Sequence, residues 1–143
     1  MALSPGVKSY FRAQVAAVQA RGYWNCLNAA ETLAALLLED GGSPWIGRLR
    51  KSETRGDTVF HAPLIPLRSH GGRAWTTHYV CVERSIVYDP AGLRPYPIHR
   101  YGESVFGEEL PIEPFVTQTD VEEYLRTHDP VDARRGHPWT SVT

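Results

Sequence analysis

Neither cysteine nor charge of one sign is abundant in this sequence of 143 residues. It contains 2 cysteines, and its 15 Lys and Arg against 16 Asp and Glu give a formal net charge of -1 at pH 7. Proteins that bind nucleic acid or anionic membranes by charge carry a clear basic excess, so we expect neither partner here. Two cysteines cannot build the disulfide framework of a small secreted scaffold. We expect free thiols in a reducing compartment, the alternative being one Cys26–Cys81 bridge.

Long apolar runs are also missing. The longest run, around Ala29 to Leu38, is interrupted by Glu31 and Thr32 and is much too short to span a bilayer. The opening sequence MALSPGVKSYFRAQ lacks the basic segment and apolar run of a signal peptide. We therefore expect a cytoplasmic protein, or one delivered into a target cell without such a signal.

Metal-binding motifs are absent as well. The sequence has no CxxC or HxxxH pair, and its 6 histidines are scattered along the chain. Zinc sites usually bring their ligands in such closely spaced pairs. We predict no metal site, and nothing in the sequence indicates a cofactor.

The length and the ordinary composition indicate a single domain over residues 1–143, with a loop or tail from about residue 129. Helical spacing of apolar residues predicts helices over about 5–21 and 26–39. The second of these is apolar on nearly all sides, and such a helix belongs in the middle of a domain. We therefore expect it to be the central helix of the fold.

The residue pattern of the chain after this helix favours β-strands, which prolines interrupt. Two helices followed by an antiparallel sheet indicate the α+β class. Alternating and β-branched residues mark the strands, and prolines favour loops or sheet edges. The expected elements are a polar linker over 48–57, strands over 58–67, 73–83 and 85–89, a loop with one short strand over 90–114, and a third helix over 117–128.

The strands predicted over 73–83 and 85–89 place His78 and Asp89 on one face of the sheet. With a turn at Glu83-Arg84 the two residues lie directly opposite each other, and with a turn at Arg84-Ser85 the pairing slips by two but the face is kept. A carboxylate beside a histidine fixes the tautomer and stabilises the imidazolium, as a general base requires. The alternatives are a surface His–Asp pair or an Asp-Pro turn cap.

Cys26 stands where the irregular stretch GYWN turns into the central helix. The positive end of the helix dipole and the first backbone N–H groups favour a thiolate, and the same N–H groups can stabilise an oxyanion. The alternative is a small buried hydrophobe in a non-catalytic protein-binding domain. Cys81 is three positions from His78 on the same strand, so it points to the opposite face and is expected in the core.

The order of a cysteine opening a buried helix, a histidine in a strand and an aspartate ending the next strand resembles the papain-like cysteine hydrolase superfamily. THYVCVERSIVYDPAG is similar to the His-strand-Asp-Pro segment of the papain-fold toxins and effector deamidases of bacteria, and to the peptidase domains of bacteriocin-exporting transporters. The resemblance implies a central N-terminal helix packed against an antiparallel sheet. It implies that Cys26 is the nucleophile, His78 the general base and acid, and Asp89 the orienting residue.

Enzymes of this superfamily usually carry a glutamine about six residues before the cysteine, and its side chain completes the oxyanion hole. The nearest here is Gln19, seven residues before Cys26 and still in the first predicted helix. Asn25 or Asn28 could take its place, or the main-chain N–H of Cys26 serves alone. Three aromatic residues flank the predicted site, either as core packing or as the lining of a substrate groove: Tyr23, Trp24 and Trp75.

The resemblance implies a Cys-His-Asp hydrolase that attacks protein amides through a thioester, foremost a bacterial toxin or effector that deamidates protein glutamine. Its partners would be a protein substrate and, for a toxin, an immunity or inhibitor protein. A cysteine peptidase is the first alternative, because the chemistry up to breakdown of the acyl-enzyme is the same. The second alternative is the non-catalytic binding domain, with Cys26 buried and inert.

Overall fold

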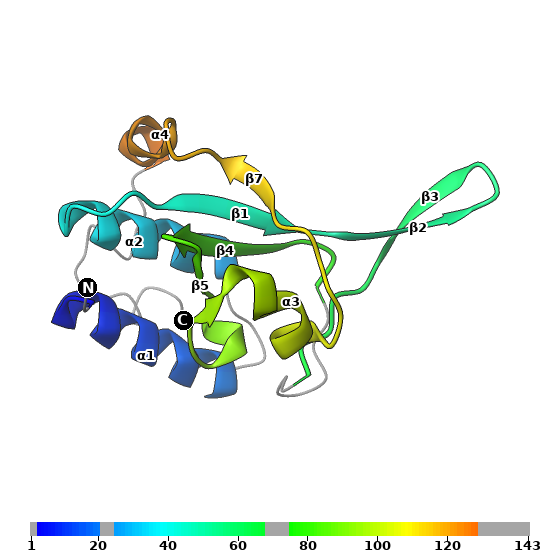
Figure 1. Cartoon of the computed structure of the whole chain (residues 1–143), viewed down its shortest axis with the longest axis horizontal. Coiled ribbons are helices and arrows are strands. Elements are labelled where there is room, and N and C mark those ends of the chain that lie inside the picture. The colour runs from blue at the N-terminus through cyan, green and yellow to red at the C-terminus, as the bar shows by residue number, and fades with distance from the viewer. Residues whose placement is uncertain (1–2, 21–24, 68–74, 129–143) are drawn as a thin grey trace.

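The computed structural model describes residues 3–20, 25–67 and 75–128. Within these ranges the chain folds into a mixed α+β structure with four α-helices and an antiparallel sheet, so the predicted α+β class is confirmed (Figure 1). In the same ranges, no helix combines the length and the hydropathy needed to cross a membrane. The predicted tail from residue 129 lies outside the described residues. The helices are α1 (Pro5–Ala20), α2 (Cys26–Glu39), α3 (Ile98–Phe106), α4 (Val121–His128) and the short 3-10 helix η1 (Pro90–Gly92).

The main sheet is antiparallel and has β4 at its centre. Its strand order is β6-β5-β4-β1-β7, and a separate two-stranded sheet pairs β2 with β3. In Figure 1 this β2–β3 hairpin extends away from the rest of the molecule. The strands are β1 (Trp45–Leu49), β2 (Lys51–Arg55), β3 (Thr58–Ala62), β4 (His78–Glu83), β5 (Ile86–Tyr88), β6 (Tyr96–Pro97) and β7 (Glu113–Val116).

The two faces of β4 are covered by different helices. Cys81 lies in the core cluster that includes Leu33 and Ala34 of α2. Val80, its neighbour in sequence, lies in the cluster that includes Tyr101 of α3. This alternation follows from the period of two along a strand. Helix α2 therefore packs on one face of the sheet and α3 on the other.

The two N-terminal helices have the predicted bounds to within one residue. α1 packs beside α2 and contributes Val7 and Phe11 to the same core cluster. The ring of Phe11 meets that of Tyr88 edge-on, with 6.4 Å between their centroids. Helix α2 thus lies between α1 and the sheet, which is the position that its apolar circumference predicts.

Two predictions outside these helices were wrong. The expected linker over 48–57 contains the end of β1 and all of β2, and the expected loop over 90–114 contains α3. β2 carries no alternating apolar pattern because its residues are exposed or half-buried. Within α3, a side chain on Gly102 would come within 2.6 Å of the carbonyl oxygen of Glu108. The close passage of that backbone calls for glycine, and glycine weakens the helical signal of the sequence.

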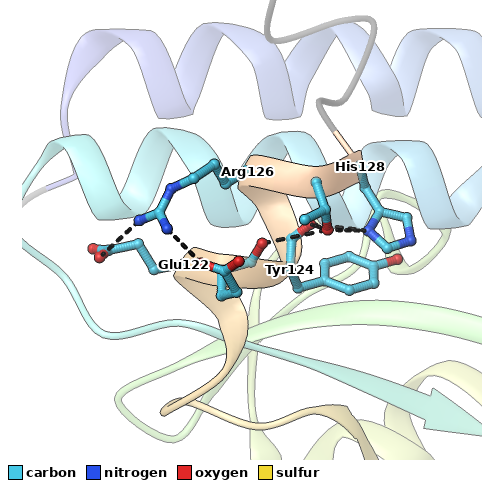
Figure 2. A network of polar contacts seen from close by, with 6 residues as sticks. Glu122, Tyr124, Arg126 and His128 are labelled. Carbon is cyan, nitrogen blue, oxygen red and sulfur yellow. Dashed lines mark hydrogen bonds and ion pairs between the residues drawn. The ribbon is translucent and has the colours of Figure 1, made fainter.

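The last described helix, α4, begins at Val121 and is linked to α2 by a partly buried side-chain hydrogen bond. The hydroxyl of Tyr124 donates to the carboxylate of Glu31, and burial raises the pKa of that carboxyl. Figure 2 shows the ring of His128 lying along that of Tyr124, with 3.9 Å between the ring centroids. On the exposed side, Arg126 reaches Glu122 at 3.8 Å. Val121 and Leu125 of α4 also belong to the core cluster that contains Leu33, so α4 packs against α2.

Candidate active site

The turn between β4 and β5 decides which residues share a face. Cys81 pairs with Tyr88 and Glu83 pairs with Ile86, so Arg84 and Ser85 form the turn. Their φ angles are 53° and 64°, as a two-residue hairpin turn of type I′ requires. The turn at Glu83-Arg84, with His78 directly opposite Asp89, is therefore wrong. The alternative register keeps both residues on one face, as expected.

His78 and Asp89 are joined by a hydrogen bond, with 2.9 Å between His78 Nε2 and Asp89 Oδ2. Both side chains have no exposed surface, so the expectation of a surface pair is wrong. The backbone N–H of Ala91 donates to Asp89 Oδ1 at 3.0 Å and caps η1, so the predicted Asp-Pro turn cap is also present. The hydroxyl of Tyr101 donates to Asp89 Oδ2. One buried carboxylate thus accepts hydrogen bonds from three groups.

Aromatic rings hold the imidazole of His78 in place. The ring of Trp75 stacks on it with 4.5 Å between centroids and an interplanar angle of 17°. Phe106 of α3 meets it edge-on at 6.1 Å. Two backbone hydrogen bonds between Leu64 and Trp75, of 2.7 and 2.9 Å, fix the segment that carries the indole. Trp75, predicted to line a groove or to pack in the core, is packed against His78.

Cys26 is the first residue of α2. The side chain of Asn25 caps the helix by accepting from the N–H of Asn28 at 3.0 Å. Cys26 is partly exposed, whereas the binding-domain alternative required it to be buried. It packs beside Ala91 and Trp75, and it lies close enough to His78 to raise the pKa of that imidazole. The start of α2 and the start of β4 therefore lie close together, although they are far apart in the sequence.

The charge on His78 depends on its two partners. Burial disfavours the imidazolium, but the negative charges and hydrogen bonds of Asp89 and Cys26 outweigh it and raise the pKa of His78 to about 10. Because Nε2 is bonded to Asp89, Nδ1 is the ring nitrogen that remains for Cys26. Near neutral pH the histidine is therefore an imidazolium between a carboxylate and a thiol.

The residues predicted to complete the oxyanion hole or to line the groove differ in their positions. Gln19 is exposed on α1, and the buried glutamine of that helix is Gln14. The side-chain oxygen of Asn25 is engaged in the helix cap, and Asn28 is partly buried in the first turn of α2. Tyr23 and Trp24 lie outside the described residues.

Two site residues on α3 were not predicted, Tyr101 and Phe106. The sequence signals that could have found them are the Pro97 that precedes the helix and the Gly107 that ends it with a φ of 80°. Tyr101 and Val105 then stand at helical spacing and are buried together. Their role depends on Asp89, which no local pattern connects to them.

The chain matches no model of a known protein family, no curated protein and no solved structure. Among the described residues, no group of three or more His, Cys, Asp or Glu side chains could hold a metal ion. The site itself consists of a buried histidine hydrogen-bonded to a buried carboxylate, with the partly exposed Cys26 close enough to raise the pKa of the histidine.

Proposed function

We propose that the protein is a thiol hydrolase of the papain-like type that acts on protein amides. In this proposal Cys26 is the nucleophile, His78 the general base and acid, and Asp89 the residue that orients His78. One observation carries it, namely that a fully buried histidine is hydrogen-bonded to a carboxylate and lies within electrostatic reach of a cysteine that opens a helix. The cysteine is the partly exposed member of the three, so a substrate can reach it.

The reaction starts with attack of the Cys26 sulfur on the amide carbonyl carbon. The imidazolium of His78 then donates its Nδ1 proton to the leaving nitrogen, the C–N bond breaks and a thioester forms. A water molecule loses a proton to the neutral imidazole and attacks the thioester carbon, which releases the acid and restores the thiolate and the imidazolium. Asp89 keeps the ring oriented and stabilises its positive charge through both steps.

The start of α2 supplies the stabilisation of the oxyanion in this proposal. The first N–H groups of a helix have no intrahelical acceptor and point along its axis. The Asn25 carbonyl and side chain accept from Ala29 and Asn28, so two N–H groups of this turn are engaged. The N–H of Cys26 itself is the donor that we assign to the oxyanion.

As substrate we propose a glutamine side chain of a protein, as in a deamidase of the toxin or effector type. The Asn-Cys context at the start of α2 and the Asp-Pro context after β5 support this choice, because both resemble those domains. A protein of this kind would be held in check by an immunity or inhibitor protein. Cleavage of a peptide bond by the same three residues is the competing outcome.

The test is to incubate a cell lysate with the protein and to map the products by mass spectrometry. Conversion of glutamine to glutamate without new chain ends, in wild type and not in Cys26→Ala, supports the deamidase. New N-termini in place of such conversions identify a peptidase.

The matched control is Cys81→Ala, which removes the other thiol from the core and leaves the site residues untouched. It should behave as wild type in both readouts. A lysate that shows neither product with wild type, together with Cys26 that is no more reactive than an ordinary thiol, contradicts the hydrolase proposal.

A further inference from the structure

Tyr101 makes a contact that the three proposed site residues do not require. Its hydroxyl donates to Asp89 Oδ2, which is the same oxygen that accepts from His78 Nε2. The other carboxylate oxygen, Oδ1, accepts from the N–H of Ala91. Tyr101 is also the largest of the fully buried side chains. A phenol hydroxyl and an imidazole therefore share one oxygen of a fully buried carboxylate.

The position of Tyr101 is fixed by α3 and not by Asp89 alone. The N–H of Ile98, at the start of α3, donates to the carbonyl of Ser85 in the β4–β5 turn at 2.8 Å. The ring of Tyr101 meets Phe106 edge-on at 6.0 Å, and Phe106 in turn meets His78. Helix α3 is thus attached to the hairpin that carries His78 and Asp89. The packing of α3 therefore fixes the position of the Tyr101 hydroxyl independently of its hydrogen bond to Asp89.

Sharing an oxygen has a chemical consequence for His78. A hydrogen bond from Tyr101 draws negative charge from Oδ2, so less of that charge is available to hold the proton on the imidazolium. A histidine that acts as a general acid has to release this proton to the leaving group. The Tyr101 hydroxyl on the same oxygen therefore weakens the attraction of Asp89 for the protonated His78. It also prevents the carboxylate from rotating.

We propose that Tyr101 is a positioning residue, which fixes the Asp89 carboxylate and limits how strongly Asp89 binds the His78 imidazolium. This role in catalysis rests on the hydrolase function proposed above. The contact itself and its effect on His78 can be measured whether or not the protein turns over a substrate.

The test compares wild type, Tyr101→Phe and Tyr88→Phe by nitrogen NMR titration of His78. Tyr101→Phe should raise the midpoint of His78 by about 0.5–1 pH unit, since Oδ2 then gives its charge to the imidazolium alone. Tyr88→Phe removes a hydroxyl from the opposite face of β5 and should leave the midpoint unchanged. A midpoint that stays the same or falls in Tyr101→Phe overturns the proposal.

A second measurement needs no variant and covers the case that Tyr101→Phe does not fold. Two protons that are donated in hydrogen bonds to the same oxygen lie close together. Wild type should therefore give a nuclear Overhauser effect between the Tyr101 hydroxyl proton and His78 Nε2–H. If both resonances are observed and this effect is absent, Tyr101 and His78 do not share Asp89 Oδ2 and the proposal is overturned. The hydrolase proposal is judged separately, by the pH profile of Cys26 alkylation. If Cys26 reacts alike in wild type and His78→Ala, the hydrolase fails, while the NMR result still decides the role of Tyr101.

Discussion

The start of α2 and the middle of β4 each hold one cysteine, and the two regions treat the thiol in opposite ways. Cys26 is partly exposed, stands at the start of a helix and lies near a histidine whose pKa is raised to about 10. Cys81 is fully buried among apolar side chains, and burial together with the charge of Glu83 raises the pKa of its thiol. The comparison teaches that the neighbouring charge and the access of solvent, rather than the residue type, decide which thiol can act.

The largest expected effect is on alkylation of the native protein. With iodoacetamide near neutral pH, Cys26 should react about 100-fold faster than Cys81 or more, because Cys81 becomes accessible only when the fold opens. Peptide mass spectrometry at early times gives both rates in one sample. Unfolding in urea should bring the two rates together. Equal, slow labelling of both thiols in the native protein would remove the contrast between the two regions.

The next effect is on stability, and it tests the carboxylate that supports the Cys26 region. Asp89→Asn should lower the free energy of unfolding by about 2–4 kcal/mol, because three donors lose a charged acceptor inside the protein. Urea denaturation measures this difference. Asp57→Asn in the exposed turn of the β2–β3 hairpin is the matched control, with an expected change within about 0.5 kcal/mol. A similar small loss in both variants contradicts a tightly bonded site.

A further effect is expected on the pH dependence of stability. The pKa of His78 is raised from its ordinary value of 6.5 to about 10, so the folded state binds a proton more tightly than the unfolded chain. The stabilisation is fully present below about pH 6.5 and is lost as the pH rises towards 10. Denaturation series at these two pH values should show this decline in wild type. The decline should be smaller in Asp89→Asn, which lacks the charge that contributes most to the rise.

The smallest effect concerns the turn between β4 and β5, which sets the register of the strands that carry Cys81 and His78. Arg84 and Ser85 adopt positive φ angles that glycine and asparagine adopt more easily. The double variant R84N/S85G should raise the free energy of unfolding by about 1 kcal/mol. Its Cys26 alkylation rate should equal that of wild type, because the register is unchanged. A change in this rate would show that the turn affects the site by another route.

The sequence predicted the parts of this site that local rules control. Helix α2 starts at Cys26 because Asn25 is a good cap, and this could be inferred from residue types alone. The shared face of His78 and Asp89 follows from the alternation of side chains along two strands joined by an even turn. Both inferences depend on residues near each other in the chain.

The contacts between distant segments could not be predicted in this way. The bond from Tyr101 to Asp89 exists because α3 packs on one face of the sheet, and the sequence around it reads as a proline-rich loop. β1 was missed partly because of Gly47, where a side chain would come within 2.3 Å of Ile112. In both cases tertiary packing requires residues that local helix or strand propensity does not favour, so the sequence pattern of the element is weak.

The projecting β2–β3 hairpin has a consequence for how this chain can be altered. Its strands pair with each other, and Val59 and Phe60 are 63% and 47% exposed, so the hairpin contributes little to the core. Lys51 and Ala62 are partners in its register, which places the two ends of the excursion side by side. A two-residue turn between them would shorten the chain and leave the sheet intact. We therefore expect the hairpin to be removable without loss of the fold, and its removal would test whether the projecting strands contribute to the reaction proposed for Cys26.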